Sequence, residues 1–180
     1  KYSRMINLAW SGDVFALDYM AAETTANKAG FGLVRLVDQL VSEGISVNII
    51  AHSLGNRVLL VAMNILGQMP GRHESIAHAF MWQPAVPDTA LSNDPERDTS
   101  VLRNWNFVHA HRAAKKIVVL YSSQDNILGP YKDKDSRRED WEAGQHGEAR
   151  SGQIGGIYRI ATSAGVPGTP VSYTHLTLPT

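Results

Sequence analysis

The chain has 180 residues, 43% of them hydrophobic, which fits one domain with a substantial core. Its 17 basic and 17 acidic residues cancel, so no excess of charge indicates binding to nucleic acid or to an anionic membrane. The absence of cysteine excludes a disulfide scaffold and a thiolate metal site, and no apolar run is long enough to span a bilayer. We expect a soluble globular domain, in a compartment that composition leaves open, with the cytoplasm favoured.

The first part of the chain predicts a strand followed by a long helix. Met5–Trp10 is a short apolar run that is typical of a strand. Over residues 16–43, apolar side chains recur at the spacing of one helix face, and Gly44 stands where a helix C-cap is expected. Gly30 and Gly32 mark places where this helix can bend or divide.

The next segment predicts a buried strand and a buried helix in direct succession. Val47–Ala51 is apolar and β-branched, with Asn48 as its polar interruption, which favours a central parallel strand buried on both faces. Residues 57–66 are apolar nearly all round and predict a buried helix that ends at Gly67 and Pro70.

Further strands are expected at Ile76–Trp82, Lys116–Tyr121 and Gly156–Thr162. A polar excursion over residues 83–106 and a charged, glycine-rich stretch over residues 132–156 separate them. Strands that alternate with helices indicate an α/β fold, with a mostly parallel sheet and helices on both faces. The sequence shows no internal repeat and no domain linker.

The segment around Ser53 is the most informative part of the chain. A buried strand runs into Ser53 and a buried helix begins directly after it, which predicts a nucleophile elbow, a strained turn that exposes the serine hydroxyl above the sheet edge. Strand and helix pass close together at such a turn, so small residues are expected two positions before and after the serine. These are Ala51 and Gly55, where glycine is usual in both places. The alternative is that Ser53 only caps the following helix.

An elbow of this kind carries specific chemical requirements. Serine is a weak nucleophile at neutral pH, so it needs a neighbouring base, and the developing oxyanion needs preorganised donors. The backbone N–H of Leu54, at the start of the helix, is the expected first donor. The second donor normally comes from a loop after an earlier strand, and no residue of this chain has that place. We therefore expect that the N-terminal strands of the sheet are missing.

The residues around the elbow resemble a bacterial, esterase- and lipase-like branch of the α/β-hydrolase superfamily whose function is poorly defined. The resemblance implies a partial α/β-hydrolase fold and a serine hydrolase that acts on small carboxylic esters through an acyl-enzyme, without a cofactor or a metal ion. It covers most of Met5 to Thr162 and rests on the segments Asn-Leu-Ala-Trp-Ser-Gly (7–12), Ala-His-Ser-Leu-Gly-Asn-Arg followed by Val-Leu-Leu (51–60), Gln-Pro-Ala-Val-Pro-Asp (83–88) and Tyr-Ser-Ser-Gln-Asp-Asn (121–126).

In this superfamily the catalytic groups follow one another along the chain as Ser, then Asp or Glu, then His. Asp125 follows the strand at 116–121, at the end where catalytic groups gather in open α/β sheets, and is the expected acid. It would orient the histidine and stabilise its cationic form. Asp88 also follows a strand and is the alternative acid. A turn made by Asp125 and Asn126 is the structural alternative.

The catalytic histidine is not evident in the sequence. It is expected in a loop after the last strand, yet residues 161–170 contain no histidine. Chain order leaves His146 as an alternative, although its glycine-rich loop favours a solvated residue. His52 adjoins Ser53 and is expected to point away from its hydroxyl. Surface or packing roles, rather than a metal pair, are expected for His73, His78, His109 and His111.

Both ends of the chain are expected to be truncated. Residues 171–180 resemble the in-frame translation of a transposon-derived adapter used to build sequencing libraries, so we expect one domain over residues 1–170 and a non-native tail over 171–180. A genuine β-rich tail is the alternative. His175 is accordingly given no catalytic role. The native histidine is then expected beyond Pro170, and this chain is expected to be inactive or nearly so.

Three functions are compatible with these residues. The first is ester hydrolysis by a Ser-His-Asp triad, the second is a non-catalytic scaffold of the same fold that binds ligands in its cleft, and the third is amide or peptide hydrolysis. The missing histidine is the feature that discriminates between ester hydrolysis and the non-catalytic scaffold. Residues 83–106 are the candidate substrate-selecting segment. Leu102, Trp105 and Phe107 either line an apolar pocket there or belong to the core.

Overall fold

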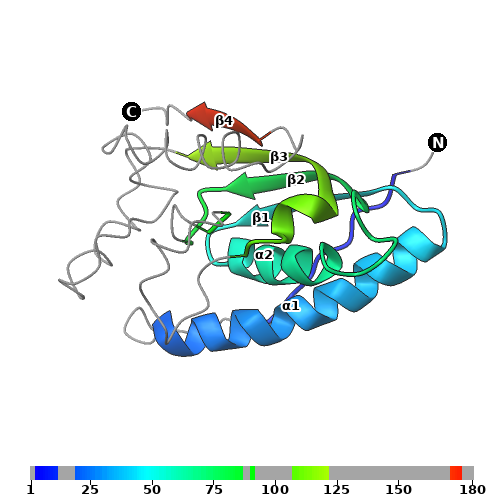
Figure 1. Ribbon diagram of the computed structural model, residues 1–180. Coiled ribbons are helices and arrows are strands. Elements are labelled where there is room, and N and C mark those ends of the chain that lie inside the picture. Colours follow the sequence, from blue (N-terminus) through cyan, green and yellow to red (C-terminus); the bar gives the residue numbers. More distant parts are fainter. Residues whose placement is uncertain (1–2, 12–18, 87–89, 92–106, 122–170, 176–180) are drawn as a thin grey trace.

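A single parallel sheet organises the chain in the computed structural model, which describes residues 3–11, 19–86, 90–91, 107–121 and 171–175 (Figure 1). Its strands lie side by side in chain order, β1-β2-β3-β4, and each neighbouring pair is parallel. This arrangement confirms the predicted α/β class. The strands are β1 (Val47–His52), β2 (Ile76–Trp82), β3 (Ala114–Tyr121) and β4 (Val171–His175), and the helices are α1 (Tyr19–Ser42), α2 (Gly55–Leu66) and the short 3₁₀ helix η1 (Ala110–Ala113).

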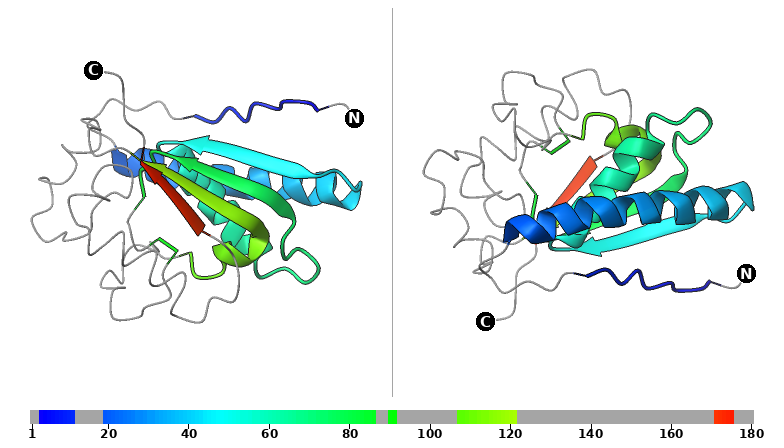
Figure 2. Two further views of the ribbon diagram at one scale, coloured as in Figure 1. Left: turned by 90° about the horizontal axis from the view of Figure 1, so that it is seen from above. Right: turned by 90° about the horizontal axis from the view of Figure 1, so that it is seen from below.

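The two long helices both lie on one side of the sheet. Helix α2 packs directly against the strands, and α1 runs along α2 on the side away from the sheet (Figures 1 and 2). Helices were expected on both faces of the sheet. Within the described ranges, the two long helices cover one face. The prediction that the strand at Val47–Ala51 is buried on both faces is therefore wrong. Its side chains alternate between buried and exposed, and Ile50 is 66% exposed.

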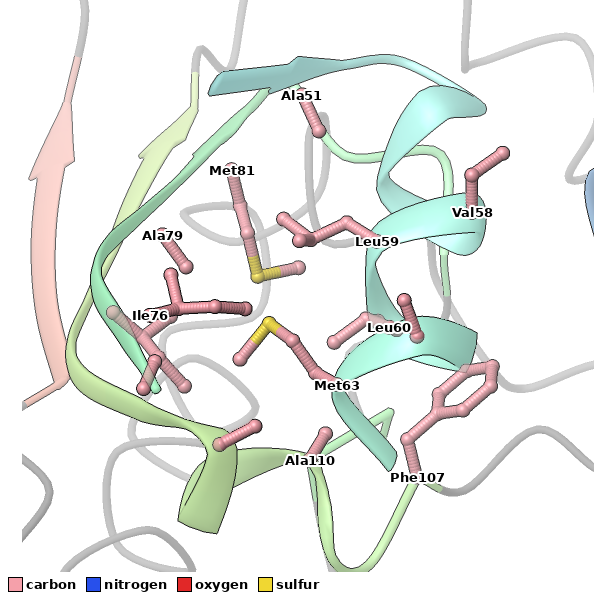
Figure 3. Close-up of a cluster of buried hydrophobic side chains, with 14 of the residues drawn as sticks. Ala51, Val58, Leu59, Leu60, Met63, Ile76, Ala79, Met81, Phe107 and Ala110 are labelled. Carbon is pink, nitrogen blue, oxygen red and sulfur yellow. The ribbon is translucent and has the colours of Figure 1, made fainter. Parts of the chain in front are cut away.

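The core fills the space between α2 and the sheet. Leu59, Met63 and Leu66 project from α2 and are fully buried, because the helix is apolar on nearly all sides. They meet buried side chains of β2 and β3 in one cluster (Figure 3). These partners are Ile76, Ala79, Met81, Ile117 and Val119.

Glycines allow α1 to end sharply and to approach α2 closely. Gly44 has a positive φ of 74°, its N–H donates to Val41 O, and the Ile45 N–H donates to Leu40 O, so the predicted C-cap is confirmed. Gly30 does not interrupt the helix. A Cβ atom at that position would lie 2.5 Å from Val61 Cγ1 of α2, so glycine is needed there for close helix packing.

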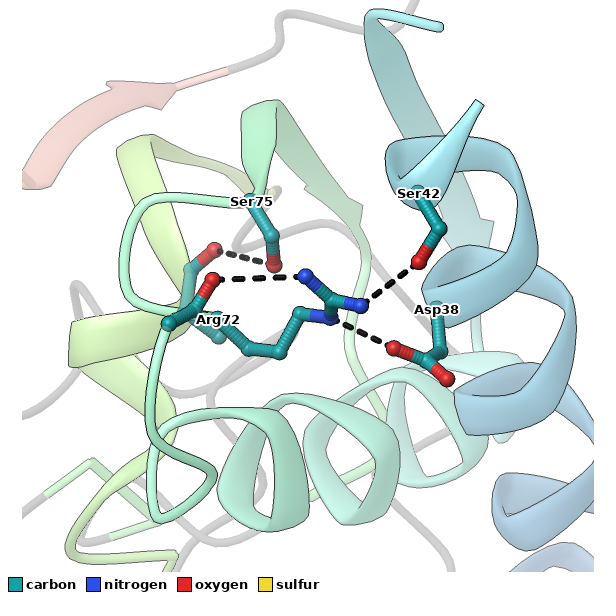
Figure 4. A network of polar contacts seen from close by, with 6 residues as sticks. Asp38, Ser42, Arg72 and Ser75 are labelled. Carbon is teal, nitrogen blue, oxygen red and sulfur yellow. Dashed lines mark hydrogen bonds and ion pairs between the residues drawn. The ribbon is translucent and has the colours of Figure 1, made fainter. Parts of the chain in front are cut away.

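A polar network ties the C-terminal end of α1 to the turn after α2 (Figure 4). The guanidinium of Arg72 donates through Nε to the carboxylate of Asp38 and through Nη2 to Ser42 Oγ at 2.6 Å. Arg72 and Asp38 keep 25% and 40% of their side-chain surface exposed. A pair that remains this accessible to water typically contributes about 0.2–1 kcal/mol.

The two ends of the chain bear on earlier expectations. Residues 5–10 do not form a strand, because they make no ladder with β1, and Met5 remains 88% exposed. Val171–His175 form β4 beside β3, and the expectation that residues 171–180 are a non-native tail stays a prediction. The strand predicted at 156–162 lies outside the described residues, as does most of the excursion at 83–106.

Candidate active site

Ser53 occupies the turn between β1 and α2, at the carboxyl edge of the sheet. Its φ is +50°, a conformation that is rare for residues other than glycine and that stores strain. The Ser53 N–H donates to Trp82 O of β2 at 3.0 Å, so the turn is fastened to the neighbouring strand as β1 ends. Strand, strained serine and helix follow one another as the predicted elbow requires.

The small residues that flank Ser53 have different surroundings. Ala51 is buried beneath α2, which agrees with the expected close approach of strand and helix. A Cβ atom at Gly55 would meet no other atom within 4 Å, so the steric demand expected at that position is wrong.

The capping alternative for Ser53 is not what the structure shows. Leu54 is the N-cap residue of α2, and no side chain makes a capping hydrogen bond at that end. Backbone bonds close the first turn instead, from Asn56 N–H to Ser53 O at 3.1 Å and from Arg57 N–H to Leu54 O at 3.0 Å. Leu54 therefore stands at the helix N-terminus, where backbone N–H groups lack intrahelical acceptors and favour negative charge.

The backbone carbonyl of Ser53 accepts three hydrogen bonds. Two come from Asn56, through its backbone N–H and through Nδ2 at 2.9 Å, and one comes from the Ala85 N–H at 3.2 Å. The same Asn56 amide also donates to Trp82 O at 3.2 Å. The turn after β2 is strained as well, since Gln83 has a φ of +40° and donates its N–H to Leu120 O. The elbow and the end of β2 therefore form one hydrogen-bonded unit.

A buried ion pair lies one helical turn beyond the elbow. Arg57 Nη1 is 3.8 Å from Glu23 Oε1, and the two side chains are only 5% and 7% exposed. Arg57 Nε also donates to Asn27 Oδ1 at 2.9 Å, and its guanidinium lies 5.9 Å from the ring centroid of Phe107. Phe107 is buried in this cluster, so it belongs to the core rather than to an exposed pocket. The cluster joins the start of α1 to the start of α2.

Aromatic and polar side chains line the sheet face away from α2. His52 contacts Trp82 edge to face, with ring centroids 5.5 Å apart, and both side chains are largely exposed. His78 stacks on Phe80 and pairs with Asn48 through Nδ1 at 2.8 Å. This agrees with the surface or packing role expected of His78.

His73, His109 and His111 lie at the opposite, amino edge of the sheet. His111 is in η1, which immediately precedes β3, and burial lowers its pKa below the ordinary value of 6.5, with the Arg112 cation lowering it further. His73 lies 3.1 Å from Gly67 O, with Nε2 as the contacting atom. Within the described ranges, no three potential metal ligands come together.

Only part of the predicted triad falls on described residues. Ser53 and Leu54 lie together at the elbow, while Asp125, Asp88 and His146 lie outside the described ranges. His175 pairs in register with Tyr121, which brings the backbone at the end of β4 to the same sheet edge as Ser53. β2 and β3 separate it from β1.

Sequence reasoning missed two contributors to this site, Asn56 and the pair Glu23–Arg57. A signal for Asn56 and Arg57 is present in the sequence, because both are polar residues at the start of an otherwise apolar helix. Glu23 carries no such signal, since its partner is far along the chain.

Among the described elements, the structure offers no helix with the length and apolarity needed to cross a membrane.

Comparisons with known proteins place the chain in a family. Neither the curated proteins nor the solved structures gave a match. A family model described as "Alpha/beta hydrolase of unknown function (DUF900)" matches residues 1–132, which include β1, α2, β2 and β3 with the elbow at Ser53. The chain therefore belongs to this α/β-hydrolase family of unknown function.

Proposed function

We propose that this protein is a serine hydrolase that acts on small carboxylic esters, with Ser53 as its nucleophile. The observation that carries the proposal is the backbone of Ser53, a residue other than glycine held at a φ of +50° between β1 and α2. Strain of this kind persists only where surrounding contacts enforce it, and it is concentrated at functional sites. Membership of a hydrolase family supports the same conclusion at the level of fold.

The proposed reaction proceeds through an acyl-enzyme. A histidine takes the proton of the Ser53 hydroxyl as Oγ bonds to the ester carbonyl carbon, and the carbonyl oxygen becomes an oxyanion. The Leu54 N–H, at the start of α2, donates to that oxyanion. The ester C–O bond then breaks, and the histidine returns its proton to the departing alcohol. Water next attacks the acyl group by the same steps, releasing the acid and restoring Ser53.

Chain order guides the choice of the acid and the base. Asp125 is our proposed acid, with Asp88 as the alternative, and His146 is the alternative base within residues 126–170. Substitution decides among them. Asp125→Asn should lower the rate by orders of magnitude if Asp125 orients the base, because the wrong imidazole tautomer is then favoured.

A covalent probe tests the proposal directly. A fluorophosphonate reacts with an activated serine, so wild-type protein that carries its catalytic histidine should gain one probe mass, on the peptide that contains Ser53. Ser53→Ala should gain none. Ser42→Ala is the matched control, because Ser42 is a hydrogen-bonded serine on α1 that plays no part in the elbow. This control should label like wild type.

The result that would overturn the proposal is equal labelling of wild type and Ser53→Ala, or no labelling of either when the catalytic histidine is present. That outcome would favour the second function, a non-catalytic scaffold that binds ligands at the same edge. Given labelling, turnover of p-nitrophenyl acetate against a p-nitroanilide of the same acyl group separates ester hydrolysis from amide hydrolysis.

A further inference from the structure

We propose that Asn56 is a positioning residue that sets the orientation of the Ser53–Leu54 peptide, and thereby of the oxyanion donor. This inference rests on the proposed function of Ser53. The Asn56 side chain is fully buried on the first turn of α2. Its Nδ2 donates to Ser53 O at 2.9 Å and to Trp82 O at 3.2 Å, so one amide group joins the elbow to the end of β2.

The chemistry of the amide fixes its orientation. Two carbonyl oxygens face the same side-chain atom, and carbonyls accept hydrogen bonds only from donors, so that atom must be nitrogen. The amide oxygen Oδ1 is consequently turned the other way. It is buried and has no hydrogen-bond partner among the described residues. Burying an acceptor without a donor is unfavourable, and a native structure that retains one calls for an explanation.

Peptide geometry connects Asn56 to the proposed oxyanion donor. The Ser53 carbonyl and the Leu54 N–H belong to one planar trans peptide, so they point in opposite directions. A donor that fixes the carbonyl oxygen therefore also fixes the direction of the N–H. The Asn56 amide lies on the carbonyl side, which directs the Leu54 N–H away from Asn56.

The strained φ of Ser53 makes this restraint necessary. A serine at +50° tends to relax toward negative φ, which would rotate the Ser53–Leu54 peptide and carry its carbonyl away from its donors. The backbone bonds from Asn56 and Ala85 oppose that rotation, and the Asn56 side chain links the Ser53 carbonyl to Trp82 O of β2 by donating to both. We infer that this link favours the reactive geometry and is most valuable in the transition state.

The test uses Asn56→Leu and Asn56→Asp in the full chain, with Asn64→Leu as the matched control. Asn56→Leu keeps the shape and removes both donors and the unsatisfied oxygen, and Asn56→Asp replaces both donors with acceptors. Asn64 is also an asparagine of α2 bonded to backbone, because its Oδ1 accepts from the His109 N–H at 2.9 Å, but it lies about three turns from the elbow.

The first measurement is amide hydrogen exchange of the Ser53 and Ala85 N–H groups, which reports the elbow whether or not Ser53 reacts. Both Asn56 variants should exchange these amides at least tenfold faster, while the α2 amides beyond Leu59 keep wild-type protection. Asn64→Leu should leave the Ser53 and Ala85 amides unchanged. The second measurement is the rate of fluorophosphonate labelling and of ester turnover, where the Asn56 variants should lose at least tenfold in kcat with little change in KM.

The outcomes separate the two proposals. If wild-type Ser53 is not labelled when the catalytic histidine is present, the proposed function fails, and the exchange data alone decide whether Asn56 restrains the peptide. If Ser53 and Ala85 keep wild-type protection in a folded Asn56→Leu or Asn56→Asp variant, the positioning role is overturned even where labelling proceeds. If Asn64→Leu loses as much kcat as Asn56→Leu, the effect is general to α2 and the inference is equally overturned.

Discussion

Removing Glu23 should destabilise this protein far more than removing Asp38, although each supplies the carboxylate of an ion pair between α1 and a later segment. The Glu23 pair with Arg57 is buried, with 7% and 5% of the two side chains exposed, whereas Asp38 and Arg72 are 40% and 25% exposed. Glu23→Ala removes the carboxylate and leaves the Arg57 guanidinium beside Asn27 in the same buried place. Asp38→Ala leaves Arg72 in contact with water.

The structure gives the size of the difference. At 3.8 Å and an effective dielectric constant of about 20, the attraction between unit charges is roughly 4 kcal/mol. Breaking one side of a buried pair typically costs about 3–5 kcal/mol, because the remaining charge stays buried and loses the attraction of that partner. An exposed pair contributes about 0.2–1 kcal/mol. We therefore expect Glu23→Ala to lower the free energy of unfolding by at least about 2 kcal/mol more than Asp38→Ala.

Urea unfolding followed by circular dichroism measures both values under the same conditions. The double replacement of Glu23 by Leu and Arg57 by Met should recover much of the loss, since apolar residues of similar volume often substitute for a buried pair at little cost. Equal losses for Glu23→Ala and Asp38→Ala would refute the reasoning, because burial would then make no difference to the strength of the pair.

Three further predictions concern packing and pH. Gly30→Leu should lower the unfolding free energy by about 1–3 kcal/mol, because its Cβ would lie 2.5 Å from Val61 Cγ1, and Val61→Ala should recover part of this in urea melts. An unchanged midpoint would contradict the close helix contact. Met63→Ala should cost about 2–5 kcal/mol in the same assay, because Met63 is fully buried between α2 and the sheet, and a loss below about 1 kcal/mol would contradict that packing. The pKa of His111 is lowered in the folded state, so the unfolded chain binds its proton more tightly. Stability from this group is therefore present above the unfolded pKa of 6.5 and is lost as the pH falls below it. The fall in urea midpoint between pH 7.5 and pH 5.5 should be smaller in His111→Gln than in wild type, and an equal fall would contradict the assignment.

The fold was predictable where one local pattern decided the outcome. The apolar period before Gly44, the β-branched run at 47–51 and the apolar helix after Ser53 each form the element expected of them, because hydrophobic periodicity and glycine conformation act over a few residues. The strand expected at residues 5–10 failed because a strand also needs a partner, which its own composition does not specify. The exposure of Ile50 was not predicted for a similar reason. A run of apolar residues does not specify whether one or both faces of its strand will be covered by other elements.

The candidate site also has one part that a local sequence pattern predicts and another that depends on tertiary structure. Ser53 and Leu54 were recognisable because a strand, a small-residue turn and a helix are contiguous in the sequence. The part played by Asn56 was not, because its two acceptors become neighbours only when β2 pairs with β1. Glu23 and Arg57 meet only through the packing of α1 on α2. Contacts of this kind depend on tertiary structure, and no local pattern predicts them.

The agreement between strand order in space and in the chain has a consequence for biosynthesis. Each described strand pairs with the strand that precedes it, so a growing polypeptide adds new strands at a free edge and inserts none between strands already paired. Every hydrogen-bond partner described for the Ser53 backbone also lies between Ser53 and Ala85. The strained turn can therefore assemble from one continuous stretch as soon as Ala85 has left the ribosome, before β4 has been translated.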